Sequence, residues 1–312
     1  MINSSKKVCA VVVTYNRRVL LKRCLDGVLK QDYAISQIIV VDNNSNDDSQ
    51  EYINRTLGKA LLSVGVNLIW KRLSANIGGA GGFSKGVEEF LKHDFDYVWL
   101  MDDDGYPEAS CLRHLISAAD TNSYIGPVVL SDKDKSSLSF PVRLPSSFKT
   151  IDSLESLNKQ AKELKGVVLP FNGTLISAEV VKKIGVPDSK YFIWGDEVDY
   201  TGRAQNAGAY ISTICDAFYY HPKEANVGKP MFFGLLRFND PNSELKLYCY
   251  CRNNFVNKKK YCGLPHAILF AGKAVWYFCF TMPSLTKLRI VLEAFYNGIN
   301  NNFDNHAKYF QK

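Results

Sequence analysis

The sequence predicts an α/β protein, with a mainly parallel sheet flanked by helices and a helical C-terminal extension. Short β-branched or apolar runs alternate with stretches whose apolar residues recur at helical spacing. Such alternation is typical of βαβ units, in which helices cover both faces of a parallel sheet. Ligands of these sheets bind beyond the carboxyl ends of the strands, so polar residues that end a strand are the first candidates for a site.

The first hundred residues contain four apolar runs that predict strands, of which the first, second and fourth are expected to be buried. These runs cover residues 8–14, 38–41, 66–70 and 98–101. Helical spacing between them predicts one helix through Leu20, Cys24 and Val28, a second from Ser49 onward, and a third through Phe83, Val87 and Phe90. Each strand is thus followed by a helix that can pack on the sheet.

The next stretch has a less regular pattern. A helix is expected through Leu112, Leu115 and Ile116, whereas residues 131–156 are rich in Ser, Lys, Asp and Pro and predict an excursion or loop. Ser177 is a suitable N-cap for a helix that follows a turn at residues 171–174. Another helix begins near residue 196, a strand covers 210–215, and His221 closes the body.

Charge is unevenly distributed along the 312 residues, which carry a net charge of +7. Residues 222–312 hold 13 basic against 5 acidic side chains, whereas residues 1–221 are almost neutral. We therefore expect a body at 1–221 and a basic, aromatic, mostly helical extension at 222–312 that meets an anionic partner. Lipid, nucleic acid and a charged carrier all fit this charge, although the near-neutral body disfavours nucleic acid.

The cysteine pattern, the N-terminal residues and the apolar run near the C-terminus together predict a cytoplasmic protein. The eight cysteines include no Cys-x-x-Cys pair, and Cys249, Cys251 and Cys262 make a poor zinc pattern. Residues 1–7 are polar and show no secretory signal. The apolar run at 264–285 is broken by Lys273, so we expect a helix that packs on the domain or lies at a membrane surface rather than one that spans it.

Three consecutive carboxylates, Asp102, Asp103 and Asp104, end the fourth predicted strand. Adjacent like charges resist ionisation unless a positive charge neutralises them. Asp102 and Asp104 are two residues apart, so on an extended chain they point the same way and can share a divalent cation. An acidic turn before Gly105 is the alternative, and this stretch alone does not separate the two.

Further candidates lie at other strand ends and near the end of the body. Thr14, Asn16 and Asp42 follow the first two strands, and a glycine-rich loop at 76–82 can bring backbone close to a flat or anionic ligand. That loop fits neither the P-loop nor the G-x-G-x-x-G pattern, and a flexible turn is the alternative. A second set comprises Asp196, Glu197, Asp199 and His221. The three carboxylates suit either helix capping or general-base catalysis next to Trp194 and Gly195.

Five segments in this order resemble family 2 glycosyltransferases of the GT-A fold, a Rossmann-like architecture. They are Val-Val-Val-Thr-Tyr-Asn-Arg at 11–17, Val-Val-Asp-Asn-Asn-Ser at 40–45, Asn-Ile-Gly-Gly-Ala-Gly-Gly-Phe at 76–83, Met-Asp-Asp-Asp at 101–104, and Gly-Asp-Glu-Val-Asp-Tyr-x-x-Arg-Ala at 195–204. Within the family the chain is most similar to bacterial galactofuranosyltransferases, also through Tyr250-x-Arg252-Asn253. Rhamnosyltransferases share much of the pattern.

The resemblance implies roles for individual residues. Those implied to bind the nucleotide sugar are Thr14, Asn16, Arg17, Asp42, Asn76, Gly79, Asp102 and Asp103. Asp102, Asp104 and His221 are implied to bind Mn²⁺ or Mg²⁺. The catalytic base is expected at Glu197, where the family usually has Asp, so Asp196 is a rival. Trp194 and Asp199 are expected to bind the acceptor.

The implied reaction is an inverting transfer of galactofuranose from UDP-galactofuranose to a lipid-linked surface glycan, such as an O-antigen of lipopolysaccharide. The metal would stabilise the leaving diphosphate while the base removes a proton from the attacking hydroxyl. The enzyme is then expected to be cytoplasmic and peripheral at the inner face of the membrane. A rhamnosyltransferase using dTDP-rhamnose and a non-catalytic nucleotide-sugar-binding protein are the alternatives.

Overall fold

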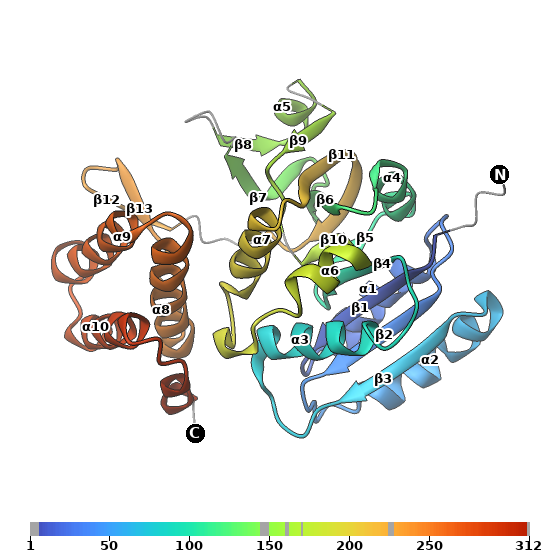
Figure 1. Ribbon diagram of the computed structural model, residues 1–312. Coiled ribbons are helices and arrows are strands. Elements are labelled where there is room, and N and C mark those ends of the chain that lie inside the picture. Colours follow the sequence, from blue (N-terminus) through green and yellow to red (C-terminus); the bar gives the residue numbers. More distant parts are fainter. Residues whose placement is uncertain (1–5, 144–149, 160–161, 170, 224–227, 311–312) are drawn as a thin grey trace. The chain divides into compact units, whose positions relative to one another are not determined.

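The computed structural model describes residues 6–143, 150–159, 162–169, 171–223 and 228–310, and the α/β prediction is confirmed (Figure 1). Strands β1 (Val8–Thr14), β2 (Gln37–Asp42), β3 (Asn67–Arg72) and β4 (Tyr97–Asp102) run parallel, in the order β3-β2-β1-β4. Helices α1 (Arg18–Leu29), α2 (Ser49–Val64) and α3 (Gly78–Phe90) connect them. The carboxyl ends of these strands therefore share one edge of the sheet.

Beyond β4 the sheet is mixed. Strand β10 (Asn172–Ser177) runs antiparallel to both β4 and β6 (Ser123–Ser131), and β11 (Tyr210–His221) runs parallel to β6. The short strand β5 (Tyr106–Pro107) pairs with the end of β11. This pairing brings the end of β11, where His221 lies, next to the segment that follows the acidic triplet.

Residues 131–156 are not simply a loop, which corrects the sequence prediction. The described part forms β7 (Ser137–Arg143), β8 (Thr150–Ser153) and helix α5 (Leu154–Asn158), while residues 144–149 lie outside the described residues. Leu138, Val142 and Ile151 are buried in a small core that they share with residues of β6 and β11. The remaining elements of this half are α4 (Cys111–Ala118), β9 (Glu163–Lys165), α6 (Ala178–Ile184), the 3₁₀ turn η1 (Ser189–Tyr191) and α7 (Asp196–Asn206). Ser177 caps α6 as predicted, because its hydroxyl accepts from Val180 N.

Strand β1 supplies side chains to two hydrophobic cores. Val8, Ala10 and Val12 pack with apolar residues of α1 and α2, whereas Cys9, Val11 and Val13 pack with those of α3 and α6. All seven residues of β1 are buried. Alternate side chains of a strand point to opposite faces, so burial on both faces explains the unbroken apolar run in the sequence.

The glycine-rich segment is mostly helix rather than loop, a second correction. Helix α3 begins at Gly78, so its glycines form the first turns of the helix. A Cβ on Gly82 would lie 2.4 Å from Val13 Cγ1, and one on Gly86 would lie 2.3 Å from Val11 Cγ1. These glycines let the helix pack closely on β1. Gly79 differs, because a Cβ there would meet nothing within 4 Å.

The chain divides into two compact units, which are described separately. Unit 1 comprises residues 1–77, 82–187 and 200–223, and unit 2 comprises 78–81, 188–199 and 224–312. Residues 188–199, expected in the N-terminal body, are thus grouped with the C-terminal helices. Unit 2 contains β12 (Lys229–Met231), β13 (Leu236–Phe238), α8 (Glu244–Tyr261), α9 (Leu264–Trp276), a π-helical turn (Tyr277–Thr281), α10 (Leu285–Ile299) and η3 (Asp304–Tyr309). Among the described helices, none is both long and apolar enough to cross a bilayer.

Candidate functional site

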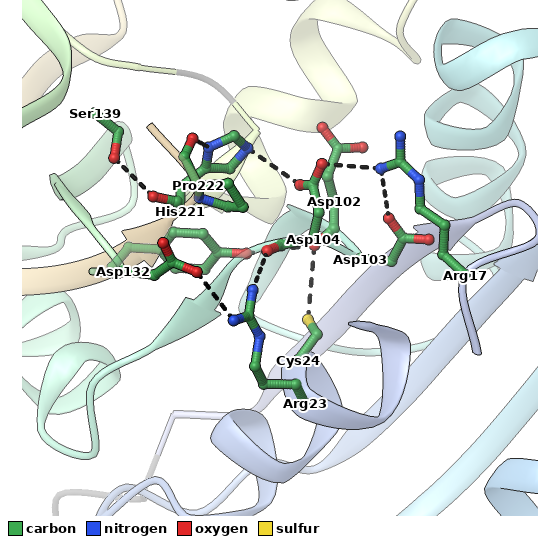
Figure 2. A network of polar contacts seen from close by, with 11 residues as sticks. Arg17, Arg23, Cys24, Asp102, Asp103, Asp104, Asp132, Ser139, His221 and Pro222 are labelled. Carbon is green, nitrogen blue, oxygen red and sulfur yellow. Dashed lines mark hydrogen bonds and ion pairs between the residues drawn. The ribbon is translucent and has the colours of Figure 1, made fainter. Parts of the chain in front are cut away.

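The acidic triplet lies where β4 ends, in unit 1 (Figure 2). Asp102 is the last residue of β4, whereas Asp103 and Asp104 form a turn, so the extended-chain geometry assumed from the sequence does not continue past Asp102. The Asp102 carbonyl accepts from Tyr219 Oη at 3.3 Å and from Cys24 Sγ at 3.6 Å. Contacts from β11 and α1 therefore fix the point where the strand ends.

Arg17 neutralises two of the three carboxylates. Its Nη1 donates to Asp104 Oδ2 at 2.8 Å and to Asp103 Oδ1 at 3.2 Å. Thr14 Oγ1 donates to Asp103 Oδ2 at 2.7 Å. Burial raises the pKa of Asp103 to about 6 in spite of Arg17 and Thr14. Burial, reinforced by Asp104 and Asp103, raises the pKa of Asp102 well above its usual range.

His221 faces the triplet from the end of β11. Its Nε2 lies 3.1 Å from Asp104 Oδ1, and its Nδ1 lies 2.7 Å from the Pro222 carbonyl oxygen. Since a carbonyl oxygen only accepts, Nδ1 carries the hydrogen, and this arrangement directs Nε2 at Asp104. Burial opposes protonation of His221, but Asp104 raises its pKa above the ordinary value. The Ser139 hydroxyl donates to the His221 carbonyl at 2.8 Å and helps to hold this segment.

The donor chemistry of Asp102, Asp104 and His221 suits a divalent cation. Asp104 Oδ1 is buried and has no well-aligned hydrogen bond, although His221 Nε2 is close to it. The Nδ1 bond to a backbone carbonyl is the usual support of a histidine that binds a metal through Nε2. Within the part of the chain that the structure describes, however, no three His, Cys, Asp or Glu side chains are grouped as a metal site. The ligand set therefore stays a prediction.

Arg23 and Asp132 support the acidic triplet from the backbone side of Asp104, and the sequence analysis missed both residues. Arg23 Nη2 donates to the Asp104 carbonyl at 2.8 Å, and its Nη1 donates to Asp132 Oδ2 at 3.0 Å. The guanidinium also lies over the Tyr106 ring, 4.8 Å from its centroid. Figure 2 shows Arg23 reaching the backbone carbonyl of Asp104, whereas Arg17 contacts its carboxylate. The sequence signal available for Arg23 was its position in α1 beside Cys24, which is buried.

The ends of β1 and β2 form the neighbouring part of the site. Thr14 pairs in register with Asp42, as Val13 does with Asp102, so these strand ends are adjacent as the strand-end rule predicted. Asp42 Oδ1 accepts from Ser45 N at 2.8 Å, and the Asn16 N–H donates to Ser45 Oγ at 2.9 Å. Asn16 and Asp42 are thus joined through Ser45. Asn76 follows β3 in the same unit.

The other predicted residues belong to unit 2, at the start of α7. Trp194 and Gly195 have positive φ angles of 57° and 97°. A Cβ on Gly195 would lie 2.8 Å from Asn253 Cβ, so the close approach of α8 requires glycine there. Glu197 Oε2 accepts from Gly195 N at 2.6 Å, which is the capping contact considered for this cluster. Asp196 is only 4% exposed, whereas Glu197 is half-buried.

Buried polar residues of α8 hold the segment before Glu197. Asn253 Nδ2 lies within hydrogen-bond distance of the Tyr191, Ile193 and Trp194 carbonyls. Arg252 Nη2 also donates to the Tyr191 carbonyl, at 3.0 Å. Asn257, one helical turn beyond Asn253, donates to the Gly195 carbonyl and accepts from Tyr191 Oη. Arg252 and Asn253 stood out in the sequence, and Asn257 was missed although its i+4 spacing from Asn253 places it on the same helix face.

Asp199 is engaged with the end of α8. Its Oδ1 accepts from Lys260 Nζ at 2.7 Å and from Tyr261 Oη at 2.8 Å. The residue is 2% exposed. Burial raises the pKa of Tyr191, and the Asp199 carboxylate nearby adds to the effect. Asp199 therefore ties the start of α7 to α8.

Comparisons with known proteins identify the family of the chain. Residues 9–185 match the family described as Glycosyl transferase family 2. The chain is 35% identical over 293 residues to galactofuranosyltransferase GlfT1 of Mycolicibacterium smegmatis, covering 90% of this chain and 93% of that protein.

Two solved structures share the fold at low identity. The crystal structure of S. aureus TarS has a TM-score of 0.58 at 16% identity, and the match covers 98% of this chain but only 50% of TarS. The mannosyltransferase PcManGT from Pyrobaculum calidifontis, solved with GDP-Man and Mn²⁺, has a TM-score of 0.56 at 13% identity, with 98% and 84% covered. These likenesses support the GT-A-like fold predicted from the sequence.

Proposed function

Because the chain belongs to glycosyltransferase family 2, we propose that it transfers galactofuranose from UDP-galactofuranose to a lipid-linked surface glycan, with inversion at the anomeric carbon. The observation that carries the proposal is the 35% identity to a galactofuranosyltransferase along 90% of the chain. The strand-end cluster of unit 1 supports it, since this is where a nucleotide ligand binds in such a sheet.

Unit 1 binds the donor in this proposal. Asn16, Asp42 and Asn76 contact the nucleoside, and Arg17 meets a phosphate while Thr14 orients Asp103 toward the sugar. Gly79, the second residue of α3, belongs to unit 2, and its role at the donor stays a prediction. Asp102, Asp104 and His221 hold Mn²⁺ or Mg²⁺. When bound, the cation supplies charge stabilisation to the departing diphosphate, an effect worth several kcal/mol. The buried Asp104 Oδ1 and the Nδ1-anchored His221 support this assignment.

Glu197 is the proposed base for the acceptor hydroxyl. It is more exposed than Asp196, and it is the second residue of α7, two positions after Gly195. Trp194 offers a flat surface on which an apolar sugar face can pack. Because Asp199 is buried and bonded to Lys260 and Tyr261, we assign it the positioning of the acceptor segment rather than direct contact.

The location follows from the acceptor. A lipid-linked glycan lies at a membrane, so we place the enzyme in the cytoplasm, peripheral at the inner face of the cell membrane. The basic and aromatic residues 222–312 support this location, since such a composition suits an anionic surface.

A donor panel tests the proposal. Donor turnover with Mn²⁺ should be detected for UDP-galactofuranose and not for UDP-galactopyranose or dTDP-rhamnose, with the lipid-linked acceptor or a soluble analogue. Turnover of dTDP-rhamnose instead would identify a rhamnosyltransferase, and tight donor binding without turnover would identify a non-catalytic protein.

Single substitutions separate the roles of the acidic residues. We expect Asp102→Ala and Asp104→Ala each to lower turnover by at least about 10²-fold. The metal assignment is wrong if both variants keep full activity. Glu197→Gln should lose proton abstraction while Asp196→Asn keeps it, and the reverse result would move the base to Asp196.

A further inference from the structure

Most of the large apolar side chains that are exposed among the described residues belong to unit 2. They include Phe233, Leu235, Ile268, Leu269, Trp276 and Phe280, each between 41% and 106% exposed. Single exposed apolar residues are normal, but a contiguous group marks an interaction site. The group therefore needs a partner.

The turn between β12 and β13 is built from apolar residues, Phe-Phe-Gly-Leu at 232–235. We call it the apolar turn. Tight turns usually consist of Gly, Asn, Asp, Pro or Ser. Phe232 and Phe233 nevertheless have positive φ angles of 48° and 56°, a conformation that bulky residues avoid. The Phe233 side chain is fully exposed and Leu235 is 83% exposed, so the conformation presents apolar groups to the surroundings.

The apolar turn packs against the C-terminal end of α9. The ring of Phe232 stacks on Trp276 with centroids 4.7 Å apart, and Trp276 contacts Phe280 at 4.4 Å. Along α9, Ile268 and Trp276 lie two turns apart on the exposed face. The opposite face is buried in the core of unit 2 through Ala267, Phe270 and Ala274. The exposed aromatic residues thus form one continuous surface with the turn.

Basic side chains flank this surface. Lys273 Nζ donates to the Arg237 carbonyl of β13, the strand that follows the apolar turn. Burial, and then repulsion from Lys258, lowers the pKa of Lys273. Among the residues that the structure describes, Arg237, Lys258 and Lys273 make no ion pair with a carboxylate. An anionic partner would relieve this accumulated positive charge.

We propose that the apolar turn, with Trp276 and Phe280, inserts into the interfacial region of an anionic lipid bilayer while Arg237 and Lys273 contact the lipid head groups. An apolar face rich in aromatic residues beside basic side chains is the pattern of proteins that lie on membranes. A second copy of the chain fits less well, because residues 222–312 carry a net charge of +8 and two such surfaces repel. The inference deepens the proposed function, from which it takes the membrane-bound acceptor, by naming the residues that make the contact.

The test is sedimentation of the full chain with vesicles. One set contains phosphatidylcholine with about 30 mol% phosphatidylglycerol and the other phosphatidylcholine alone. The variant Phe233→Ser/Leu235→Ser is compared with Leu62→Ser, a matched control because Leu62 is 83% exposed on α2 of unit 1. Both variants change only exposed side chains, and equal thermal midpoints would confirm that the folds are intact.

We expect the natural chain to bind the anionic vesicles in a salt-sensitive manner and the pure phosphatidylcholine vesicles much more weakly. The double variant should lose at least about tenfold in binding, whereas Leu62→Ser should bind normally. Unchanged binding of the double variant would overturn the proposal. So would a dimer of the natural chain that is lost in the double variant while vesicle binding is unaffected.

Donor turnover without vesicles separates this inference from the proposed function. The double variant should turn over donor at the natural rate in solution, since the apolar turn is outside the catalytic residues. Failure of the natural chain to turn over any donor, with vesicle binding intact, would refute the proposed function alone. Normal turnover without vesicle binding would refute this inference alone.

Discussion

Asn253→Ala tests whether α8 positions the catalytic segment. The amide of Asn253 lies within hydrogen-bond distance of the Tyr191, Ile193 and Trp194 carbonyls, and its Oδ1 accepts from Arg252 Nε at 2.8 Å. Asn253 is fully buried, so water cannot replace the amide without rearrangement. The substitution should therefore loosen the residues just before Glu197.

The expected magnitude follows from the partners that remain. The Tyr191 carbonyl keeps its bond from Arg252 Nη2, whereas the Ile193 carbonyl, the Trp194 carbonyl and Arg252 Nε each lose the Asn253 partner. At about 1 kcal/mol for each, the free energy of unfolding should fall by about 3 kcal/mol. Displacement of the base by about 1 Å should lower kcat by about 10²-fold.

The neighbouring Asn254→Ala is the matched control. Asn254 is half-buried, and its Nδ2 donates to the Tyr250 carbonyl within α8, so the loss should be about 0.5 kcal/mol or less. Urea unfolding measures stability, and steady-state kinetics separate kcat from the KM for donor. The reasoning fails if Asn253→Ala destabilises no more than Asn254→Ala, or if the donor KM changes while kcat does not.

Two further predictions concern the fold of unit 1. Gly82→Ala should lower the free energy of unfolding by about 1–3 kcal/mol, because its Cβ would lie 2.4 Å from Val13. Gly58→Ala in α2 should raise it by about 0.5–1 kcal/mol, because a Cβ there meets nothing within 4 Å. Equal effects of the two substitutions in urea unfolding would contradict the packing argument. Hydrogen bonds from Lys71 and then Lys92 lower the pKa of Glu89 to about 2. The Glu89 carboxylate thus contributes about 1 kcal/mol of stability above its unfolded pKa of about 4.5, and this contribution disappears as the pH falls toward 2. The difference in unfolding free energy between the natural chain and Glu89→Gln should shrink accordingly from pH 6 to pH 2, and a difference independent of pH would contradict the assignment.

In the N-terminal half of the sheet, β1, β2 and β4 were predictable because they are buried on both faces, whereas β3 is partly exposed. β1 contains five β-branched residues of seven and β2 four of six, and every residue of both strands is buried. Strand β6 was missed because Gly126 and Pro127 interrupt its apolar run, and both residues normally break strands. The structure accommodates Pro127 where the register of β11 against β6 shifts.

The site was predictable to the extent that strand ends define it. Thr14, Asp42 and Asp102 end parallel strands, so the topology alone makes them neighbours. The pair Arg23–Asp132 could not be foreseen, since the two residues are 109 positions apart and Asp132 follows a strand that had no clear sequence pattern. The glycine-rich segment was assigned to a loop because glycine has a low helix propensity. The close packing of these glycines on β1, which offsets the low propensity, is not visible in the sequence.

The position of β1 between two cores has a consequence for how unit 1 unfolds. Alternate side chains of β1 pack against different layers of helices, so the strand contributes to two hydrophobic cores of unit 1. Neither layer can detach without uncovering one face of the same strand, and the remaining layer would then rest on a half-exposed sheet. Unit 1 should accordingly melt as one cooperative body, with amide protons of β1 exchanging only through global opening.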